Sequence, residues 1–305
     1  MLRIAHLSDL HVLSPGGLEW REMLFNKRLT GYANFVWRRG RVHRREYLHS
    51  VLAAATEADH VVVTGDITNL AFEGEFKEAR RLLDEIARTV EVTAIPGNHD
   101  IYLARVQRDR SFERHFGPFL QSDLPDLAIE LPAGRYPCVK LRGPAAIIAL
   151  SSAVPRPPFI AAGYLGRAQL EAFSKILVHP EVTRRRPVIL IHHPPVDSRC
   201  RLARLRDGLV DGASFRAALA PLARGLVLFG HLHVRVRCVL RTPSGTVDVV
   251  GASGAALDHP DNSVRAGFNL YHVDVCNLAR AEGYVLDESA KLLSRTTITE
   301  REGCR

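Results

Sequence analysis

The chain of 305 residues has no long apolar run, and this shortage excludes a membrane-spanning protein. Its longest hydrophobic stretches, such as 145–150 and 188–191, fall far short of the roughly 18 residues that a spanning helix needs. The residues from position 2 onward are typical of a strand and show no charged and then apolar leader, so we expect neither a signal peptide nor a membrane anchor. The sequence therefore predicts a soluble, cytoplasmic protein.

Cysteine is also scarce. The five cysteines are odd in number, widely spaced and without a Cys-x-x-Cys pair: Cys138, Cys200, Cys238, Cys276 and Cys304. This pattern argues against a disulfide framework or a thiolate zinc site, and it is typical of a reducing compartment. We expect buried thiols that pack as small hydrophobic groups, with an exposed thiol at Cys304.

What the chain does have is an ordinary globular composition, with 46% hydrophobic and 24% charged residues, and a net charge of +8. The positive charge is uneven, because residues 18–50 hold eight basic and three acidic side chains. Such an asymmetry indicates an anionic partner, which could be a lipid headgroup, a nucleotide or a nucleic acid.

Short apolar runs alternate with helical spacing along most of the chain. Runs of four to six residues rich in Val, Ile and Leu predict strands covered on both faces, at 3–7, 60–64, 92–95, 145–150, 188–191 and 226–229. Between them, apolar residues spaced by three and four predict helices within 47–55, 76–86 and 170–177. This alternation predicts an α/β core.

After residue 234 the pattern changes to closely spaced strands. We expect them at 234–240, 247–250, 269–275 and 281–286, with a final candidate at 292–298. They would add a second sheet or extend the first rather than build a separate domain. Residues 101–144 and 197–212 have weaker periodicity, so we expect loops or a partial lid there.

Polar motifs follow five of the predicted strands. They are Ser8-Asp9-Leu10-His11, Gly65-Asp66, Gly97-Asn98-His99-Asp100, His192-His193-Pro194-Pro195 and Gly230-His231-Leu232-His233. Residues beyond the carboxyl ends of strands in an open α/β sheet converge on one crevice. Carboxylate, amide and imidazole ligands without thiolates suit Mn²⁺, Fe, Zn²⁺ or Ni²⁺ rather than Ca²⁺. The set is too large for one ion and predicts two sites about 3.5–4 Å apart.

These five motifs resemble the signature of the calcineurin-like metallophosphoesterase superfamily, which reads D-x-H, G-D, G-N-H-[DE], H and G-H-x-H. All five occur in order between residues 9 and 233. The resemblance implies a four-layer αββα sandwich, with two mixed sheets flanked by helices. We expect one domain over 1–305, with a basic, aromatic insertion at about 14–45 and a β-rich part from about 234.

The resemblance also implies the ligands of each metal. Carried over residue by residue, one metal takes Asp9, His11 and His233, and Asp66 bridges both. The other metal takes the remaining three: Asn98, His192 and His231. Two divalent ions are expected, with Mn²⁺ first and Fe, Zn²⁺ or Ni²⁺ as alternatives. A water or hydroxide held between the metals would attack phosphorus.

The catalytic residues predicted beside the metals are His99 and Asp100. His99 stands one residue past a ligand, so we expect it to protonate the leaving oxygen or stabilise the phosphoryl charge. Asp100 would hold that imidazole in orientation. His192 and His193 compete for one ligand position, and Pro194 at the family's spacing favours His192. His193 would lie behind the ligands or touch substrate.

Residues 18–45 carry both tryptophans among their basic residues. Two interpretations stay open for this stretch: binding to an anionic membrane surface or acyl ligand, and an amphipathic helix pair packed on the core. Nucleic acid is not the expected partner, because no base-reading motif is present.

The expected activity is hydrolysis of a phosphodiester or phosphoanhydride. The insertion is similar to that of bacterial enzymes acting on nucleotide-lipids, the UDP-2,3-diacylglucosamine pyrophosphatases, which would place the protein peripherally at the inner membrane face. Cyclic-nucleotide and glycerophosphodiester phosphodiesterases share the same motifs and are the alternative. A binding module for lipid or nucleic acid that keeps metals only for stability is the alternative of a different class.

Overall fold

The computed structural model describes residues 1–14, 27–29, 44–197, 199–275, 278–287 and 293–300. Its helices are α3 (Arg45–Ala55), α4 (Glu73–Ala87), α5 (Ala104–Arg108), α6 (Ser111–Phe116), α7 (Arg167–Leu177), α8 (Pro180–Thr183), α9 (Arg201–Asp207) and α10 (Gly212–Ala218). Two short 3₁₀ turns follow α6, namely η2 (Gly117–Leu120) and η3 (Pro125–Leu127). Most of the predicted insertion at 14–45 lies outside the described residues.

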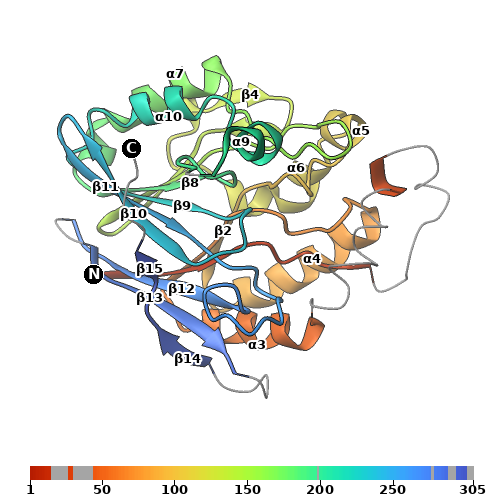
Figure 1. Cartoon of the computed structure of the whole chain (residues 1–305). Coiled ribbons are helices and arrows are strands. Elements are labelled where there is room, and N and C mark those ends of the chain that lie inside the picture. Colours follow the sequence, from red (N-terminus) through yellow and green to blue (C-terminus); the bar gives the residue numbers. More distant parts are fainter. Residues whose placement is uncertain (15–26, 30–43, 198, 276–277, 288–292, 301–305) are drawn as a thin grey trace.

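Two large mixed sheets form the centre of the molecule (Figure 1). The six-stranded sheet runs in the order β14 (Leu293–Thr296), β13 (Leu278–Leu286), β12 (Gly267–Val273), β1 (Leu2–Leu7), β2 (His60–Val63), β3 (Glu91–Ala94). The seven-stranded sheet runs β15 (Thr299–Glu300), β10 (Val236–Thr242), β11 (Gly245–Gly251), β9 (Arg224–Phe229), β8 (Arg186–Leu190), β7 (Ala145–Ala149), β6 (Cys138–Arg142). A small hairpin joins β4 (Ile129–Leu131) to β5 (Gly134–Tyr136).

The two sheets pack face to face through apolar side chains. Ile4 and Val62 from the six-stranded sheet meet Val188 and Leu226 from the seven-stranded sheet, and all four are fully buried. Such strands are apolar on both faces because the opposite faces are covered by helices. The sequence pattern predicts these strands for that reason.

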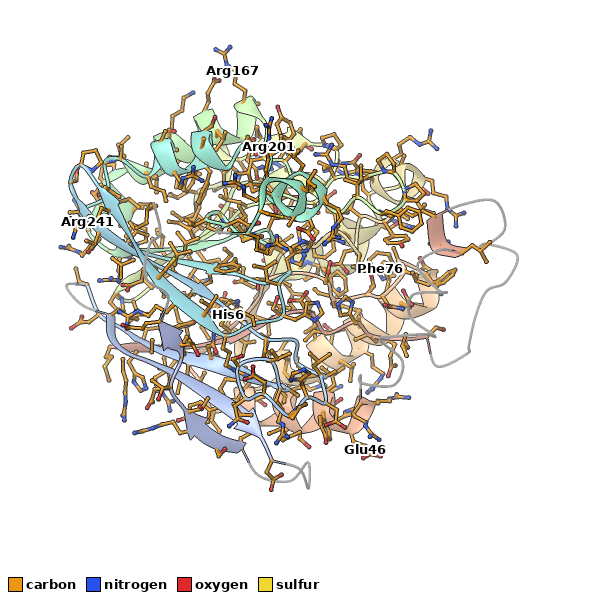
Figure 2. All side chains as sticks on the ribbon, viewed as in Figure 1. His6, Glu46, Phe76, Arg167, Arg201 and Arg241 are labelled. Carbon is orange, nitrogen blue, oxygen red and sulfur yellow. The ribbon has the colours of Figure 1, made fainter. Side chains whose placement is uncertain are left out.

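Helices cover the outer face of each sheet (Figure 1). Val51 of α3 and Leu83 of α4 pack on the six-stranded sheet, while Phe173 of α7 and Phe215 of α10 stack on the other side of the molecule. Figure 2 shows that the helices have a buried and an exposed face, since Phe76 of α4 is turned inward and Arg167 of α7 points outward. The predicted αββα architecture is confirmed.

The structure corrects three expectations. Residues 101–144 are not mainly loop, since they form α5, α6, the β4–β5 hairpin and the edge strand β6. Residues 201–207 form α9 within the second predicted loop. The strands after residue 234 extend both sheets, because β12–β14 join the first and β10, β11 and β15 join the second. These elements were missed because each is too short to show a clear helical or strand period in the sequence.

The expectation of buried, unpaired cysteines is wrong at two positions. Cys238, on β10, is disulfide-bonded, and Cys200 is a free thiol but exposed, whereas Cys138 is a free thiol as expected. Cys138 is buried, and burial raises the pKa of its thiol to about 12. Within the described ranges, no helix combines the length and apolar character needed to cross a membrane.

Candidate metal centre

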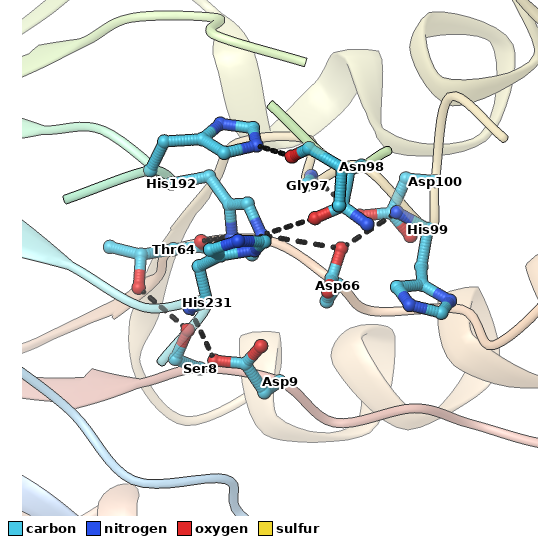
Figure 3. A network of polar contacts seen from close by, with 12 residues as sticks. Ser8, Asp9, Thr64, Asp66, Gly97, Asn98, His99, Asp100, His192 and His231 are labelled. Atoms are coloured by element: carbon cyan, nitrogen blue, oxygen red, sulfur yellow. Dashed lines mark hydrogen bonds and ion pairs between the residues drawn. The ribbon is translucent and has the colours of Figure 1, made fainter. Parts of the chain in front are cut away.

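The predicted ligands lie in the loops that follow β1, β2, β3, β8 and β9. Figure 3 shows Asp9, Asp66, Asn98, His192 and His231 brought close together. Backbone hydrogen bonds tie the first two loops together. The amide of Asp9 donates to the Gly65 carbonyl at 3.0 Å, and that of His11 donates to the Asp66 carbonyl at 3.0 Å. The polar motifs are therefore brought together by parallel pairing of their strands.

Five predicted ligands have left-handed backbone conformations. Their φ angles are 53° at Asp9, 45° at His11, 51° at Asp66, 66° at His231 and 54° at His233. This region costs a non-glycine residue roughly 1–2 kcal/mol relative to an ordinary conformation. Residues kept there by their surroundings are concentrated at functional sites. The tight turns bend the chain so that successive motif side chains point into one space.

One cluster consists of Asp9, His11 and His233. Asp9 and His11 follow β1 of the six-stranded sheet, and His233 follows β9 of the other sheet. The Nε2 atom of His233 lies 3.1 Å from Asp9 Oδ1 and 3.4 Å from His11 Nε2. Asp66 Oδ2 lies 4.0 Å from His11 Nε2. This set matches the first ligand group implied by the motifs.

A second cluster surrounds His192 Nε2. That nitrogen lies 3.2 Å from Asn98 Oδ1, 3.3 Å from His231 Nδ1 and 3.4 Å from Asp66 Oδ1 (Figure 3). Asp66 therefore turns one oxygen toward each cluster. A carboxylate in that position is suited to bridge two cations.

The backbone holds the Asp66 carboxylate in place. The His99 amide donates to Asp66 Oδ1 at 2.8 Å. A side chain at Gly97 would collide with the same oxygen, so the close approach requires glycine at that position. The orientation of this carboxylate is thus fixed by the third loop as well as by its own.

The residues present are suited to divalent ions. Ligand atoms about 2.0–2.2 Å from an ion lie roughly 3.0–3.4 Å from each other, and several pairs here have such spacings, from 3.1 to 3.4 Å. Asp9 Oδ1 is buried, and its close neighbour among the described residues is another predicted ligand, His233 Nε2 at 3.1 Å, which suits an oxygen that binds metal. Asp66 and Asn98 offer hard oxygens and the histidines offer borderline nitrogens.

The ionisation of the cluster is consistent with that use. Burial alone would raise the pKa of Asp66, but His192 and His99 lower it well below its usual value. Burial would also raise the pKa of Asp9, but the nearby His233 lowers it to about 2. Burial would lower the pKa of His192, yet Asp66 raises it to about 9. Without metal, a proton on His192 compensates the buried carboxylates, and a cation would take its place.

The two adjacent histidines both lie near His231, but they differ in what their ring nitrogens contact. His192 Nδ1 donates to the Thr64 carbonyl at 2.7 Å, which leaves Nε2 directed at the other ligands. His193 is fully buried, with Nε2 donating to the Ala161 carbonyl at 2.8 Å and Nδ1 bonded to Ser152 Oγ at 2.8 Å. Both of its ring nitrogens thus hold the chain segment after β7.

His99 lies beside the metal cluster, with its ring 4.8 Å from that of His11. Its Nδ1 donates to the Asn69 carbonyl, so Asn69 orients the ring. This differs from the expectation for Asp100. The Asp100 carboxylate instead accepts from the amides of Ile67, Thr68 and Gly97 and from the Thr68 hydroxyl, and so fixes two loops. Burial, and then Asp66, raise the pKa of Asp100 to about 7.

The sequence did not predict the residues whose backbone carbonyls orient the histidine rings. Thr64 and Asn69 orient His192 and His99 with main-chain oxygens, and no side-chain pattern encodes such contacts. Tyr102 was missed too, although its ring stacks on His99 with centroids 5.4 Å apart. Its position three residues after a motif histidine is the one signal that could have indicated it.

Two clusters that share a bridging carboxylate, on an αββα sandwich, define the class of dinuclear metal hydrolases. The family model for calcineurin-like phosphoesterases matches residues 2–235, and the chain belongs to that family. Family membership and the clusters together indicate a centre for two divalent ions.

Individual proteins are similar to this chain in sequence or in fold. A protein of Rhodococcus erythropolis described as a probable cyclic nucleotide phosphodiesterase is 26% identical over 239 residues, covering 75% of this chain and 64% of that protein. The fold is similar to a dimetal phosphatase of Danio rerio, with TM-score 0.53, 16% identity and 98% of each chain covered. It is also similar to the purple acid phosphatase PPD1 of yellow lupin, with TM-score 0.60, 12% identity and coverage of 99% of this chain and 54% of that one.

Proposed function

We propose that the chain hydrolyses a phosphodiester or phosphoanhydride. The observation that carries this proposal is that six predicted ligand side chains gather around a seventh, Asp66, and that the ring of His99 is held at their edge. Two divalent ions held by these residues, Mn²⁺ first among them, would polarise the phosphoryl group and supply a nucleophile from water at neutral pH.

His99 is the residue of this chain that we propose moves a proton. Its Nδ1 donates a hydrogen bond to the Asn69 carbonyl. We therefore propose that the other ring nitrogen, Nε2, exchanges a proton with the substrate. A proton at Nε2 would pass to the leaving oxygen as the phosphorus–oxygen bond breaks. The His99 amide donates to Asp66 Oδ1 at 2.8 Å, which holds the backbone of His99 next to the predicted ligands.

A cyclic nucleotide is one substrate that we propose. It is supported by the Rhodococcus relative, whose description names a cyclic nucleotide phosphodiesterase. The chain spans 64% of the length of that relative. The shared motifs describe the reacting centre, whereas the nucleoside would be recognised by other residues.

An amphipathic nucleotide-lipid such as UDP-2,3-diacylglucosamine is the second candidate. Large apolar side chains are exposed near each other along 159–160 and α9, where Phe159 is 81%, Leu202 77% and Leu205 61% accessible. The Ala161 amide bonds to the Arg206 carbonyl, so the two segments are adjacent. Exposed arginines, among them Arg201, share α9 with the leucines (Figure 2). Such a surface suits acyl chains and anionic headgroups, and peripheral association with the inner membrane face would follow.

The first test compares an aryl phosphodiester with its monoester, using Mn²⁺-loaded protein and a chelated control. Faster, chelator-sensitive cleavage of the diester is expected. Cyclic nucleotides and UDP-diacylglucosamine are then compared by kcat/KM, and parallel loading with Fe, Zn²⁺ and Ni²⁺ ranks the metals. Ligand binding that survives chelation, with no turnover of any substrate, would favour the alternative of a non-catalytic binding module.

The role of His99 is tested by the His99→Gln variant. Metal content should stay at the wild-type level, while turnover falls by roughly 10²–10⁴-fold, the usual contribution of a general acid. His115→Gln is the matched control, because His115 lies away from the centre on α6. Near-full turnover by His99→Gln would remove the proposed acid.

For the membrane surface, flotation with vesicles containing anionic phospholipid is compared with flotation on neutral vesicles. Anionic vesicles should be preferred, and reversing charge at Arg201 and Arg204 should weaken that preference. Equal binding to both kinds of vesicle would remove the electrostatic argument.

A further inference from the structure

The described part of the basic insertion, residues 27–29, is fastened to the core by a buried arginine. Arg28 is 2% exposed, and its guanidinium donates to the carbonyls of Leu70 at 2.9 Å and Ala71 at 2.5 Å. The same guanidinium lies over the Phe72 ring, 4.1 Å from its centroid. These contacts fix the position of the backbone at residue 28, and therefore also that of its neighbour Lys27.

Three contacts hold Lys27 against Tyr102 and the segment that contains Ile160. Its Nζ atom lies 4.5 Å from the centroid of the Tyr102 ring and donates to the Ile160 carbonyl at 3.2 Å. The Tyr102 hydroxyl donates in turn to the Lys27 carbonyl at 3.5 Å. Because Tyr102 also stacks on His99, the lysine and the proposed acid pack on one aromatic ring.

The charge of Lys27 is linked electrostatically to the centre. Burial lowers the pKa of its ammonium to about 8, and Asp66 opposes that change. The group therefore stays mainly protonated at neutral pH. An ammonium in a partly buried site attracts a phosphate more strongly than one on an open surface, since less water screens the interaction.

We infer that Lys27 is a specificity-determining residue that binds an anionic group on the leaving part of the substrate. The inference rests on the proposed function, in which His99 protonates the leaving oxygen. Lys27 and His99 both contact the ring of Tyr102, so in this proposal the ammonium binds the leaving group that His99 protonates. The substrate class it favours is a phosphoanhydride or phosphodiester whose leaving group carries a second phosphate or carboxylate.

The test uses two substrates and the metal-loaded full chain. Lys27→Met should lower kcat/KM for a nucleoside diphosphate sugar by roughly 10–100-fold, the usual range for a lost charge-assisted hydrogen bond. The same variant should change kcat/KM for bis(p-nitrophenyl) phosphate, whose leaving group carries no further phosphate or carboxylate, by less than about threefold. Lys27→Arg should recover most of the loss. Lys77→Met is the matched control, because Lys77 is 70% exposed on α4.

Equal loss on both substrates, or no loss on either, would overturn the inference. Failure of the proposed function is a distinct result, because the wild-type protein would then cleave neither substrate. The role of Lys27 remains testable in that case through binding of a nonhydrolysable α,β-methylene diphosphate analogue, measured by calorimetry. Lys27→Met should raise its Kd roughly tenfold or more, and an unchanged Kd would contradict the assignment.

Discussion

The two sheets contribute different chemistry to the same centre. The loops of the six-stranded sheet supply the oxygens of Asp9, Asp66 and Asn98, together with one imidazole, whereas the loops of the seven-stranded sheet supply His192, His231 and His233. Neither sheet alone holds a complete set for either cluster. Although burial would raise both pKa values, His233 lowers that of Asp9, and His192, with His99 of the same sheet as Asp66, lowers that of Asp66. The packing between the sheets therefore completes the site as well as the core.

The largest effect should come from neutralising the Asp66 carboxylate, which turns one oxygen toward each cluster. Asp66→Asn keeps the shape of the side chain but loses the charge that neutralises two cations. We expect turnover to fall by roughly 10³-fold or more, with metal content falling in parallel, because the ions supply several kcal/mol of transition-state stabilisation. Metal analysis and diester hydrolysis check this, with Asp84→Asn on α4 as the control. Full metal content with normal turnover would show that Asp66 does not bridge.

The contribution of the seven-stranded sheet is tested by comparing two neighbouring histidines, His192 and His193. His192→Gln should lose metal and lower activity by roughly 10²-fold or more, since it removes a direct ligand. His193→Gln should retain metal but lower the free energy of unfolding by about 1–3 kcal/mol, because Ser152 and Ala161 lose buried hydrogen-bond partners. Metal content and thermal unfolding separate the two. If His193→Gln lost metal and His192→Gln kept it, the ligand assignment would have to be reversed.

A smaller effect tests whether the backbone positions the bridging carboxylate. Gly97→Ala places a Cβ against Asp66 Oδ1, so the carboxylate must move. A displacement of about 1 Å at a reacting centre can cost up to roughly 10²-fold in rate. Gly117→Ala is the control, since a Cβ there would meet its nearest neighbour at 3.9 Å. Similar kcat values for both variants would mean that the loop after β3 adapts freely.

The last prediction concerns a buried carboxyl group outside the clusters, which should affect stability rather than turnover. Glu75, at the start of α4, is 3% exposed, and burial raises its pKa to about 7, from 4.5. Between these values the folded state holds more protons than the unfolded state, so stability falls as pH rises from about 4.5 to 7. Glu75→Gln should remove this decline and stabilise the protein above pH 7 by up to about 3 kcal/mol. Denaturant unfolding at pH 5 and pH 8 measures it, and an identical slope in both proteins would contradict it.

The sequence could predict the strands and the strand-end motifs because both depend on side-chain patterns. Continuous apolar runs identified the strands that carry Asp9, Asp66 and His192, and parallel pairing then required their loops to meet. The orienting contact of His99 could not be predicted, because its partner is a backbone carbonyl. The role of Asp100 was misjudged for the same reason, since its carboxylate binds main-chain amides. The disulfide of Cys238 could not be read from residue spacing alone.

The pairing of β1 has a consequence for the synthesis of this protein on the ribosome. β1 hydrogen-bonds on one side to β2, only about sixty residues downstream, and on the other to β12, at Gly267–Val273. A nascent chain can form the first pairing early, but the opposite edge of β1 stays open until β12 has been translated. Because an open strand edge invites pairing with other chains, we expect the half-made protein to depend on chaperones until its last strands emerge.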